Sequence, residues 1–274
     1  MNRLSSNVML EELKAIASDT EIVDGFPADD HSQINTQIDI AEGKQEAADH
    51  SEICSVFTPL HFEPNYAYPL LIWLHGEDEN EMHLRQVMPK ISMRNYAAVA
   101  PRGTLSLSLD EQQTSQSNGT FSWSLRNGDY CEAIERVCRA IERAEERFKI
   151  DKDRIFLAGK GSGGTMALQI GMTLPETFSG VISVGGPLPR KDALLAHLDK
   201  SRQVPVLLTV DRDNDQYPDT MVCADLRLLH IAGMTVTLRQ YPAGEILRDS
   251  MLSDIDQWIM DVLASEKKTP IVTG

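Results

Sequence analysis

From residue 51 onward, short apolar runs alternate with longer stretches in which apolar residues recur at helical spacing. Short runs rich in β-branched or large apolar residues predict buried strands, and the stretches between them predict amphipathic helices. The predicted strands are Ile53–Phe57, Pro69–Leu74, Tyr96–Ala100, Arg154–Ala158, Gly180–Val184, Val204–Val210 and Thr235–Arg239. The predicted helices are His83–Met93, Asp129–Phe148, Gly163–Leu174, Ala193–Asp199, Asp219–Ile231 and Asp249–Leu263. Because this alternation is typical of βαβ units, it predicts an α/β fold with a mostly parallel central sheet flanked by helices on both faces.

Two stretches depart from the alternation. Residues 1–50 contain eleven Asp or Glu against three Lys or Arg, and few large apolar side chains. Such a segment buries too little apolar surface to offset the entropy lost on ordering. We expect an acidic N-terminal extension over 1–50, partly disordered or carrying a docking helix at Ser6–Ile16, and one domain over 51–274. The stretch Gly103–Gly119 is rich in Ser, Thr and Gln and is expected to be a long surface loop.

Charge and cysteine usage exclude several classes of protein. The formal net charge is −15 and the pI is about 4.8, which repels nucleic-acid phosphates and anionic membrane surfaces, so we expect neither as a partner. The four cysteines show no CxxC pair and no Cys/His metal spacing, so we expect free thiols, no metal and no cofactor. No signal-peptide pattern and no run of about 18 apolar residues is seen, which predicts a cytoplasmic protein. The oligomeric state stays open, a homodimer included.

A glycine cluster follows the predicted strand Arg154–Ala158. Residues 153–169 read DRIFLAGKGSGGTMALQ, so a buried strand runs through a sharp turn into a helix. Further marks along the chain are Leu74-His75-Gly76, Ala100-Pro101-Arg102-Gly103, Phe121-Ser122-Trp123 and Tyr241-Pro242-Ala243-Gly244. Together these segments resemble the phospholipase/carboxylesterase family of α/β hydrolases, from about Ile53 to Ile259. The resemblance implies an α/β-hydrolase fold with a serine-esterase site, whose nucleophile sits on the strand-turn-helix.

The resemblance puts Gly161 at the position of the nucleophile. With Gly159 and Gly163 in the register of the two glycines of the motif, Gly161 lies midway between them, and glycine has no atom with which to attack. Ser162 is the alternative nucleophile. That register, however, puts Lys160 two positions before the nucleophile, where the turn requires a small residue.

The triad histidine of the family would fall on Glu245. The family text after the last strand resembles Tyr-Pro-x-Gly-His, whereas this chain reads Tyr241-Pro242-Ala243-Gly244-Glu245. A carboxylate with an ordinary pKa of about 4.3 is poorly matched to removing an alcohol proton at neutral pH. His197 precedes the strand that carries the acid, and His230 falls inside a predicted helix, where we expect it to pack or to lie at the helix end.

The acid of the triad is expected in the loop after Val204–Val210. That loop contains Asp211, Asp213 and Asp215. We prefer Asp213 and place Asp215 second, but the spacing of the family falls on Asn214, so a one-residue shift stays open, as does a role as solvated loop carboxylates. Glu245 or Asp213 could offer hard oxygen ligands to a metal, but no ligand spacing supports a metal site.

The loop His75-Gly76 resembles the oxyanion-hole loop of the family. The resemblance implies that the backbone N–H groups of Glu77, beside Gly76, and of Ser162 would hold a developing negative charge. Glu77 and the two acidic residues after it place carboxylates near this hole, where they oppose anion stabilisation. His75 itself is expected to be structural and to hold the loop by hydrogen bonds.

Three functional hypotheses follow. The leading one is a catalytically degenerate hydrolase, a pseudoenzyme retained for binding a small ester-like ligand or a protein partner, because both the nucleophile and the histidine are replaced. The second is an active carboxylesterase or thioesterase using Ser162, with Glu245 or Asp213 as the base. The third is a structural interaction protein that acts through its N-terminal arm.

Overall fold

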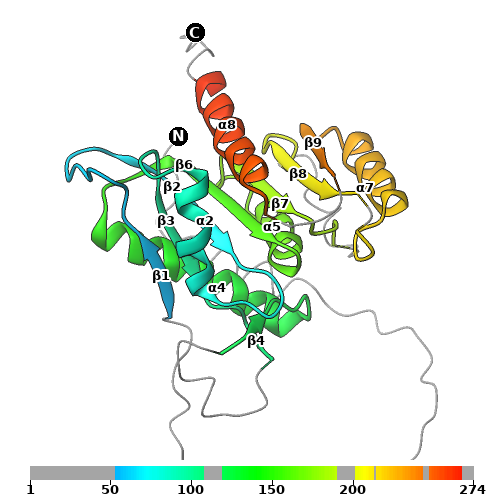
Figure 1. Cartoon of the computed structure of the whole chain (residues 1–274), viewed down its shortest axis with the longest axis horizontal. Helices are drawn as coiled ribbons and strands as arrows, with labels where there is room; N and C mark the ends of the chain where they lie inside the picture. The colour runs from blue at the N-terminus through cyan, green and yellow to red at the C-terminus, as the bar shows by residue number, and fades with distance from the viewer. Residues whose placement is uncertain (1–52, 108–118, 190–200, 213, 243–246, 267–274) are drawn as a thin grey trace, which may run out of the picture. The chain divides into compact units, whose positions relative to one another are not determined.

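The computed structural model describes residues 53–107, 119–189, 201–212, 214–242 and 247–266 (Figure 1). Several predictions lie outside these residues: the extension over 1–50, the helix Ala193–Asp199, and the site candidates Asp213 and Glu245.

The described residues form one seven-stranded sheet in the order β1-β3-β2-β6-β7-β8-β9. Its strands are β1 Cys54–Phe57, β2 Tyr68–Leu74, β3 Ala97–Pro101, β6 Ile150–Lys160, β7 Gly180–Val184, β8 Val206–Asp211 and β9 Val236–Tyr241. β1 is antiparallel to β3, and the other neighbouring strands are parallel. Parallel strands covered on both faces need continuous apolar runs, and every residue of β2, β3, β7 and β8 is buried. The predicted α/β fold is therefore confirmed.

Helices cover both faces of the sheet (Figure 1). They are α2 Leu84–Ile91, α4 Asn127–Arg147, α5 Ser162–Thr173, α7 Asp219–Ile231 and α8 Asp249–Glu266, with a 3-10 turn η2 at Glu81–His83. On one face, α2 and α8 share an apolar core with Trp73, Phe156 and Ile182 of the sheet. Strand residues alternate between the two faces, and α4 and α5 pack against β3 and β6 on the other side.

Most of the elements predicted from the sequence are present. All seven predicted strands occur, and five of the six predicted helices fall in the described residues and are confirmed. One expectation needs correction. The predicted loop over 103–119 contains the short strand β4 Leu105–Ser106, which pairs with β5 Phe121–Ser122. This pairing was missed because a two-residue strand with exposed side chains leaves no hydrophobic alternation to detect.

Candidate functional site

The turn between β6 and α5 has its apex at Gly161. Gly161 has φ 52° and ψ −121°, and Ser162 is the first residue of the helix. L-residues rarely adopt this backbone conformation, so a side chain at position 161 would be strained, whereas glycine accommodates it. The positive φ therefore falls on Gly161 and not on Ser162.

The glycines on either side of the apex fix this threading. A Cβ added to Gly159 would lie 2.3 Å from the carbonyl oxygen of Gly163. A Cβ added to Gly163 would lie 2.3 Å from the carbonyl oxygen of His75. Strand and helix thus approach so closely that only glycine fits two positions before and two positions after Gly161, which is the spacing of a nucleophile elbow.

Ser162 faces a second hydroxyl. Its Oγ lies 3.0 Å from Oγ of Ser122 on β5, and either oxygen can donate. Ser122 is buried and Ser162 half-buried. Among the described residues, no imidazole or carboxylate is hydrogen-bonded to the Ser162 hydroxyl, so no described general base is in position to deprotonate it.

The side chain of Glu77 occupies the space above the apex. The backbone N–H of Ser162 donates to Oε1 of Glu77 over 2.7 Å. A Cβ on Gly161 would lie 2.3 Å from Oε2 of the same carboxylate. The structure therefore brings Gly161, Ser162, Gly76 and Glu77 together, with the Glu77 carboxylate on the Ser162 N–H.

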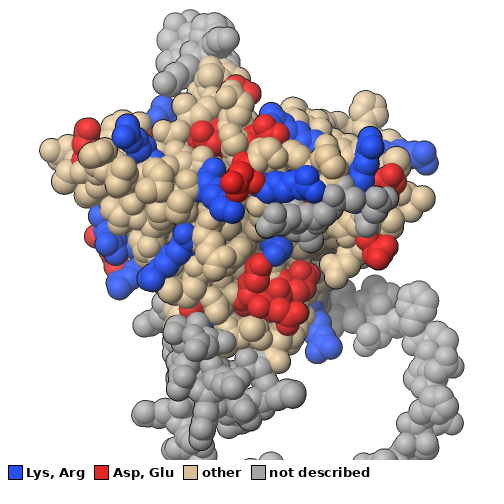
Figure 2. Space-filling view, in the orientation of Figure 1, with Lys and Arg blue, Asp and Glu red and all other residues tan. Residues whose placement is uncertain are grey.

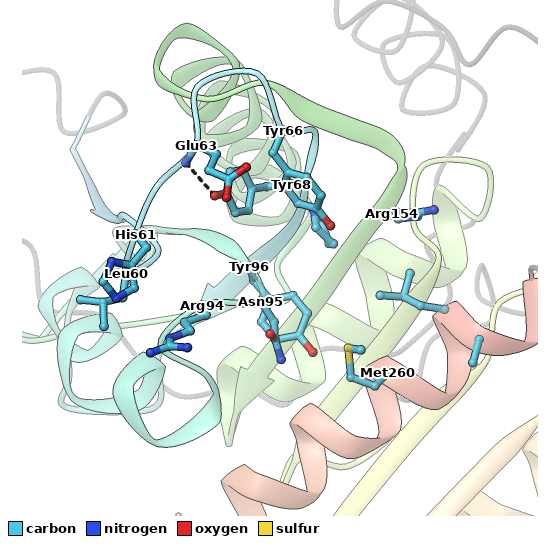
Figure 3. A pocket seen from close by; sticks show the side chains of 13 residues that line it. Leu60, His61, Glu63, Tyr66, Tyr68, Arg94, Asn95, Tyr96, Arg154 and Met260 are labelled. Carbon is cyan, nitrogen blue, oxygen red and sulfur yellow. Dashed lines mark hydrogen bonds between the residues drawn. The ribbon is translucent and has the colours of Figure 1, made fainter.

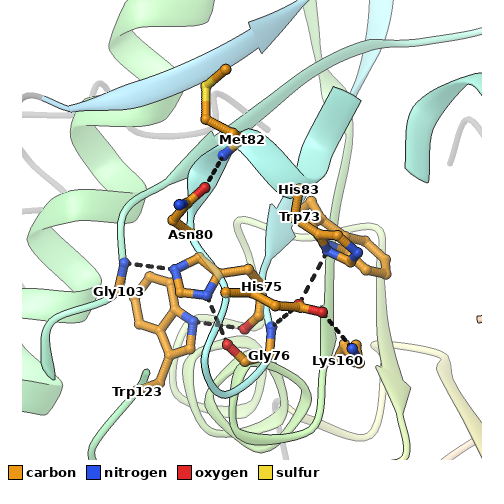
Figure 4. A network of polar contacts seen from close by, with 10 residues as sticks. Trp73, His75, Gly76, Asn80, Met82, His83, Gly103, Trp123 and Lys160 are labelled. Carbon is orange, nitrogen blue, oxygen red and sulfur yellow. Dashed lines mark hydrogen bonds and ion pairs between the residues drawn. The ribbon is translucent and has the colours of Figure 1, made fainter. Parts of the chain in front are cut away.

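A second carboxylate, that of Glu79, binds the same loop through Gly76, within the polar network drawn in Figure 4. The backbone N–H of Gly76 donates to Oε2 of Glu79 over 2.8 Å, and Lys160 donates its ammonium to Oε1 of Glu79. His83 lies 3.2 Å from Glu79 and accepts a hydrogen bond from the Trp73 indole. Burial alone would raise the pKa of the Glu79 carboxyl, but the hydrogen bonds from Lys160 and Gly76 and the nearby charges of Lys160 and His83 together outweigh burial and bring that pKa below its usual range. Glu79 is thus an ionised staple between the loop and the end of β6.

His75 is an anchor of this loop, as the sequence suggested. It is fully buried, its Nδ1 lies 2.9 Å from the carbonyl oxygen of Gly76, and its Nε2 accepts the Gly103 backbone N–H over 2.9 Å. These two contacts assign the neutral ring with the proton on Nδ1. Burial lowers the pKa of His75 to about 4, so the ring is neutral at pH 7. Trp123 donates to the His75 carbonyl over 3.0 Å and closes the anchor.

The loop after β8, where the acid of the triad is expected, lies only partly within the described residues. Asp211 is the last residue of β8 and is buried, and burial raises the pKa of its carboxyl. Its Oδ1 is buried without a hydrogen-bond partner among the described residues. Asp215 is exposed in the following turn, and His230 is exposed in the last turn of α7. Neither of these two is hydrogen-bonded to Ser162, and the preferred candidates Asp213 and Glu245 lie outside the described residues.

Sequence reasoning missed two features of this site. It expected acidic side chains near the hole, but not that Glu77 would bind the Ser162 N–H directly. The signal was the glycine at position 161, since only a missing side chain leaves room for the carboxylate. The contact between Ser122 and Ser162 joins residues 40 positions apart, and no local pattern could reveal it.

The pocket drawn in Figure 3 lies at the end of the strands opposite to the elbow. It encloses about 630 Å³ and is lined by residues that include Tyr66, Tyr68, Tyr96, Arg154 and Met260. Tyr68 is the first residue of β2 and Tyr96 precedes β3, so the pocket adjoins the amino ends of strands whose carboxyl ends reach the elbow. It is therefore separate from the elbow.

Two further properties of the described residues concern metal binding and membrane-spanning helices. No group of three or more His, Cys, Asp or Glu side chains in the described ranges could hold a metal ion. Within the same part of the chain, no helix has the length and apolar character needed to cross a membrane.

A mostly parallel sheet that feeds a strained strand-turn-helix, with an N–H donor at the helix start and a His-Gly loop beside it, defines the α/β-hydrolase class of protein. The family profile of phospholipases and carboxylesterases matches residues 65–263. The chain belongs to the phospholipase/carboxylesterase family.

Solved structures share this fold. The Arabidopsis thaliana protein SOBER1 is 18% identical, with a TM-score of 0.58 over 72% of this chain and all of its own. A carboxylesterase from Bacillus cereus is 16% identical, with a TM-score of 0.57 over 76% of this chain and 93% of its own. A phospholipase/carboxylesterase from Dyadobacter fermentans is 16% identical, with a TM-score of 0.51 over 76% of this chain and 95% of its own. At these identities the likeness demonstrates the shared fold and nothing about the chemistry.

Proposed function

We propose that this chain is a catalytically degenerate member of the family that binds a small ester-like ligand or a protein partner at the elbow edge of its sheet. The observation that carries the proposal is Gly161 at the apex of the elbow. Acyl transfer by this fold begins with attack by a side-chain oxygen from that position. Glycine offers no such atom, so the covalent route has no starting point there.

Glu77 supports the same proposal independently. An oxyanion hole works because its donors are free to meet negative charge as it develops. Here the Ser162 N–H already donates to the Glu77 carboxylate, and that carboxylate also fills the volume that a nucleophile's Cβ would need. A substrate carbonyl would have to displace a full negative charge before it could be polarised.

The alternative, an active carboxylesterase or thioesterase using Ser162, has less support. Ser162 starts the helix one residue beyond the apex, and its hydroxyl contacts Ser122 instead of a base among the described residues. His75 cannot supply the base, because its Nε2 lone pair already accepts the Gly103 N–H and burial lowers its pKa to about 4, which makes it a weak base. This route would have to recruit Glu245 or Asp213.

Ester hydrolysis tests the proposal directly. Removing a nucleophile or histidine from a serine hydrolase lowers turnover by roughly a millionfold, because the members act together. We therefore expect turnover of 4-nitrophenyl acetate and butyrate no faster than that of the Ser162→Ala variant, with an active serine carboxylesterase as the reference. Efficient turnover that disappears on Ser162→Ala would establish the alternative.

Ligand binding is the complementary test. A set of short-chain esters and acyl amides, screened by the shifts of backbone amides at residues 76, 77 and 162, should contain compounds that bind without being cleaved. Figure 2 shows acidic side chains gathered over the region of the loop after β2, where Glu77 and Asp78 are exposed. We therefore expect neutral compounds to bind in preference to their carboxylate analogues.

A further inference from the structure

The amino end of α5 is bound by a carboxylate of the same chain, that of Glu77. The first N–H groups of a helix have no intrahelical acceptor, and the positive end of the helix dipole favours a carboxylate. Ser162 is the first residue of this 12-residue helix, and its N–H is taken by Oε1 of Glu77 over 2.7 Å. The N–H therefore meets a negative charge before any ligand arrives.

The side chain of Glu77 is held less firmly than its loop. Glu77 is exposed, so turning its side chain toward solvent breaks one surface hydrogen bond with the described residues and disturbs none of their core packing. The loop beneath it is held separately, because Glu79 binds the Gly76 N–H and Lys160, and His75 binds Gly103. Backbone and carboxylate are thus held by different contacts.

We propose that Glu77 is an autoinhibitory plug. Its carboxylate fills the anion hole at Ser162, and a ligand oxygen binds there only when the Glu77 side chain turns away. This inference rests on the proposed function, in which the elbow edge binds a ligand, and it adds a selection rule. Anionic ligands are excluded because they compete with Glu77 for the Ser162 N–H and are also repelled by its carboxylate. Neutral carbonyl ligands compete for the same N–H but are not repelled.

The test compares anion binding at Ser162 in three variants of the full chain. The probe is butyrate, followed by the amide shifts of ¹⁵N-serine-labelled protein, with the Ser162 signal assigned by its loss in Ser162→Ala. Glu77→Ala removes the plug, and Glu77→Gln keeps its shape without its charge. Asp78→Asn is the matched control, because it removes a carboxylate one residue further along the same loop. Asn also tolerates the left-handed backbone that Asp78 adopts at φ 57°.

We expect Glu77→Ala to bind butyrate at least about tenfold more tightly than the wild type, with a shift of the Ser162 amide. A site that is open in about a tenth of the molecules has its apparent affinity reduced tenfold. Glu77→Gln should fall between the two, and Asp78→Asn should stay within about twofold of the wild type, since only a screened long-range field changes. Thermal melts verify that each variant is folded.

Three results would overturn the plug: equal butyrate affinity in wild type and Glu77→Ala, an unmoved Ser162 amide in Glu77→Ala, or an equal gain in Asp78→Asn. An equal gain in Asp78→Asn would mean that the net charge of the loop controls butyrate affinity, and not the position of the Glu77 side chain. None of these readouts depends on turnover, so an active esterase would sink the proposed function without deciding the fate of the plug.

Discussion

The loop after β2 has two sides that differ in how they are held. On one side His75 is fully buried and bonded through both ring nitrogens, and nearby Arg102 forms a buried ion pair with Glu81. On the other side the exposed Glu77 reaches over Gly161 to the start of α5. We call the buried contacts of His75 with Gly103 and of Arg102 with Glu81 the frame of the loop, and the exposed Glu77 takes no part in it. The comparison teaches that the frame is held by buried contacts that do not involve Gly161 or Ser162, so it does not depend on a nucleophile at the elbow.

The largest effect should come from breaking the buried ion pair of the frame. Arg102 donates from Nε and Nη2 to the two oxygens of Glu81 over 2.8 and 2.6 Å, and both side chains are almost fully buried. Glu81→Ala leaves the guanidinium without this partner, so we expect a loss of about 3–5 kcal/mol in the free energy of unfolding, measured with urea. Asp249→Asn, which removes the partner of the exposed Lys90, is the control and should change stability very little. A small loss in Glu81→Ala would contradict the assignment of this pair to the frame.

The next effect is a pH dependence that belongs to His75. Burial lowers the pKa of His75 from 6.5 to about 4, so the unfolded chain binds this proton more readily than the folded one. Its contribution is complete above pH 6.5 and is lost as the pH falls toward 4, for a total of about 3 kcal/mol. His75→Gln should therefore lose less stability than the wild type between pH 6.5 and 4, in paired urea titrations. Parallel pH profiles would show that the ring is not buried and neutral.

A substitution at Gly161 separates the cost of the strained backbone from the cost of the contact with Glu77. Gly161→Ser places a Cβ at positive φ and against the Glu77 carboxylate, so we expect a loss of about 2 kcal/mol. Adding Glu77→Ala should recover part of that loss, about 1 kcal/mol, because only the contact is relieved. Gly185→Ser is the control, since Gly185 also has positive φ but its Cβ would meet only Asn214 at 3.6 Å. Purely additive losses at positions 161 and 77 would show that Glu77 does not fill this space.

The smallest effect is expected at Ser162. Ser162→Ala removes one hydroxyl that bonds Ser122 at 3.0 Å, so thermal unfolding should report a loss of about 0.5–1 kcal/mol. The frame should remain intact, with unchanged backbone shifts at His75 and Gly103. A loss as large as that of Glu81→Ala would show that Ser162 is part of the frame.

The strands of the main sheet and the glycine turn could be predicted from the sequence. The remaining contacts depend on how segments far apart in the sequence meet in the fold. The apolar runs predicted the seven strands of the main sheet, because its parallel strands are covered on both faces, but not the short pair β4 and β5. The glycine spacing placed Gly161 at the nucleophile position of the resemblance, and the close contacts of Gly159 and Gly163 give the physical reason. The contact of Glu77 with Ser162 spans 85 positions and depends on a loop rotamer, which no periodicity encodes.

Covalent labelling tests the central claim most directly: that the elbow presents no nucleophile. The full chain is treated with a fluorophosphonate probe alongside an active serine carboxylesterase, and the adducts are mapped by peptide mass spectrometry. We predict quantitative labelling of the esterase and no adduct on this chain. A stoichiometric adduct on Ser162 would contradict the account.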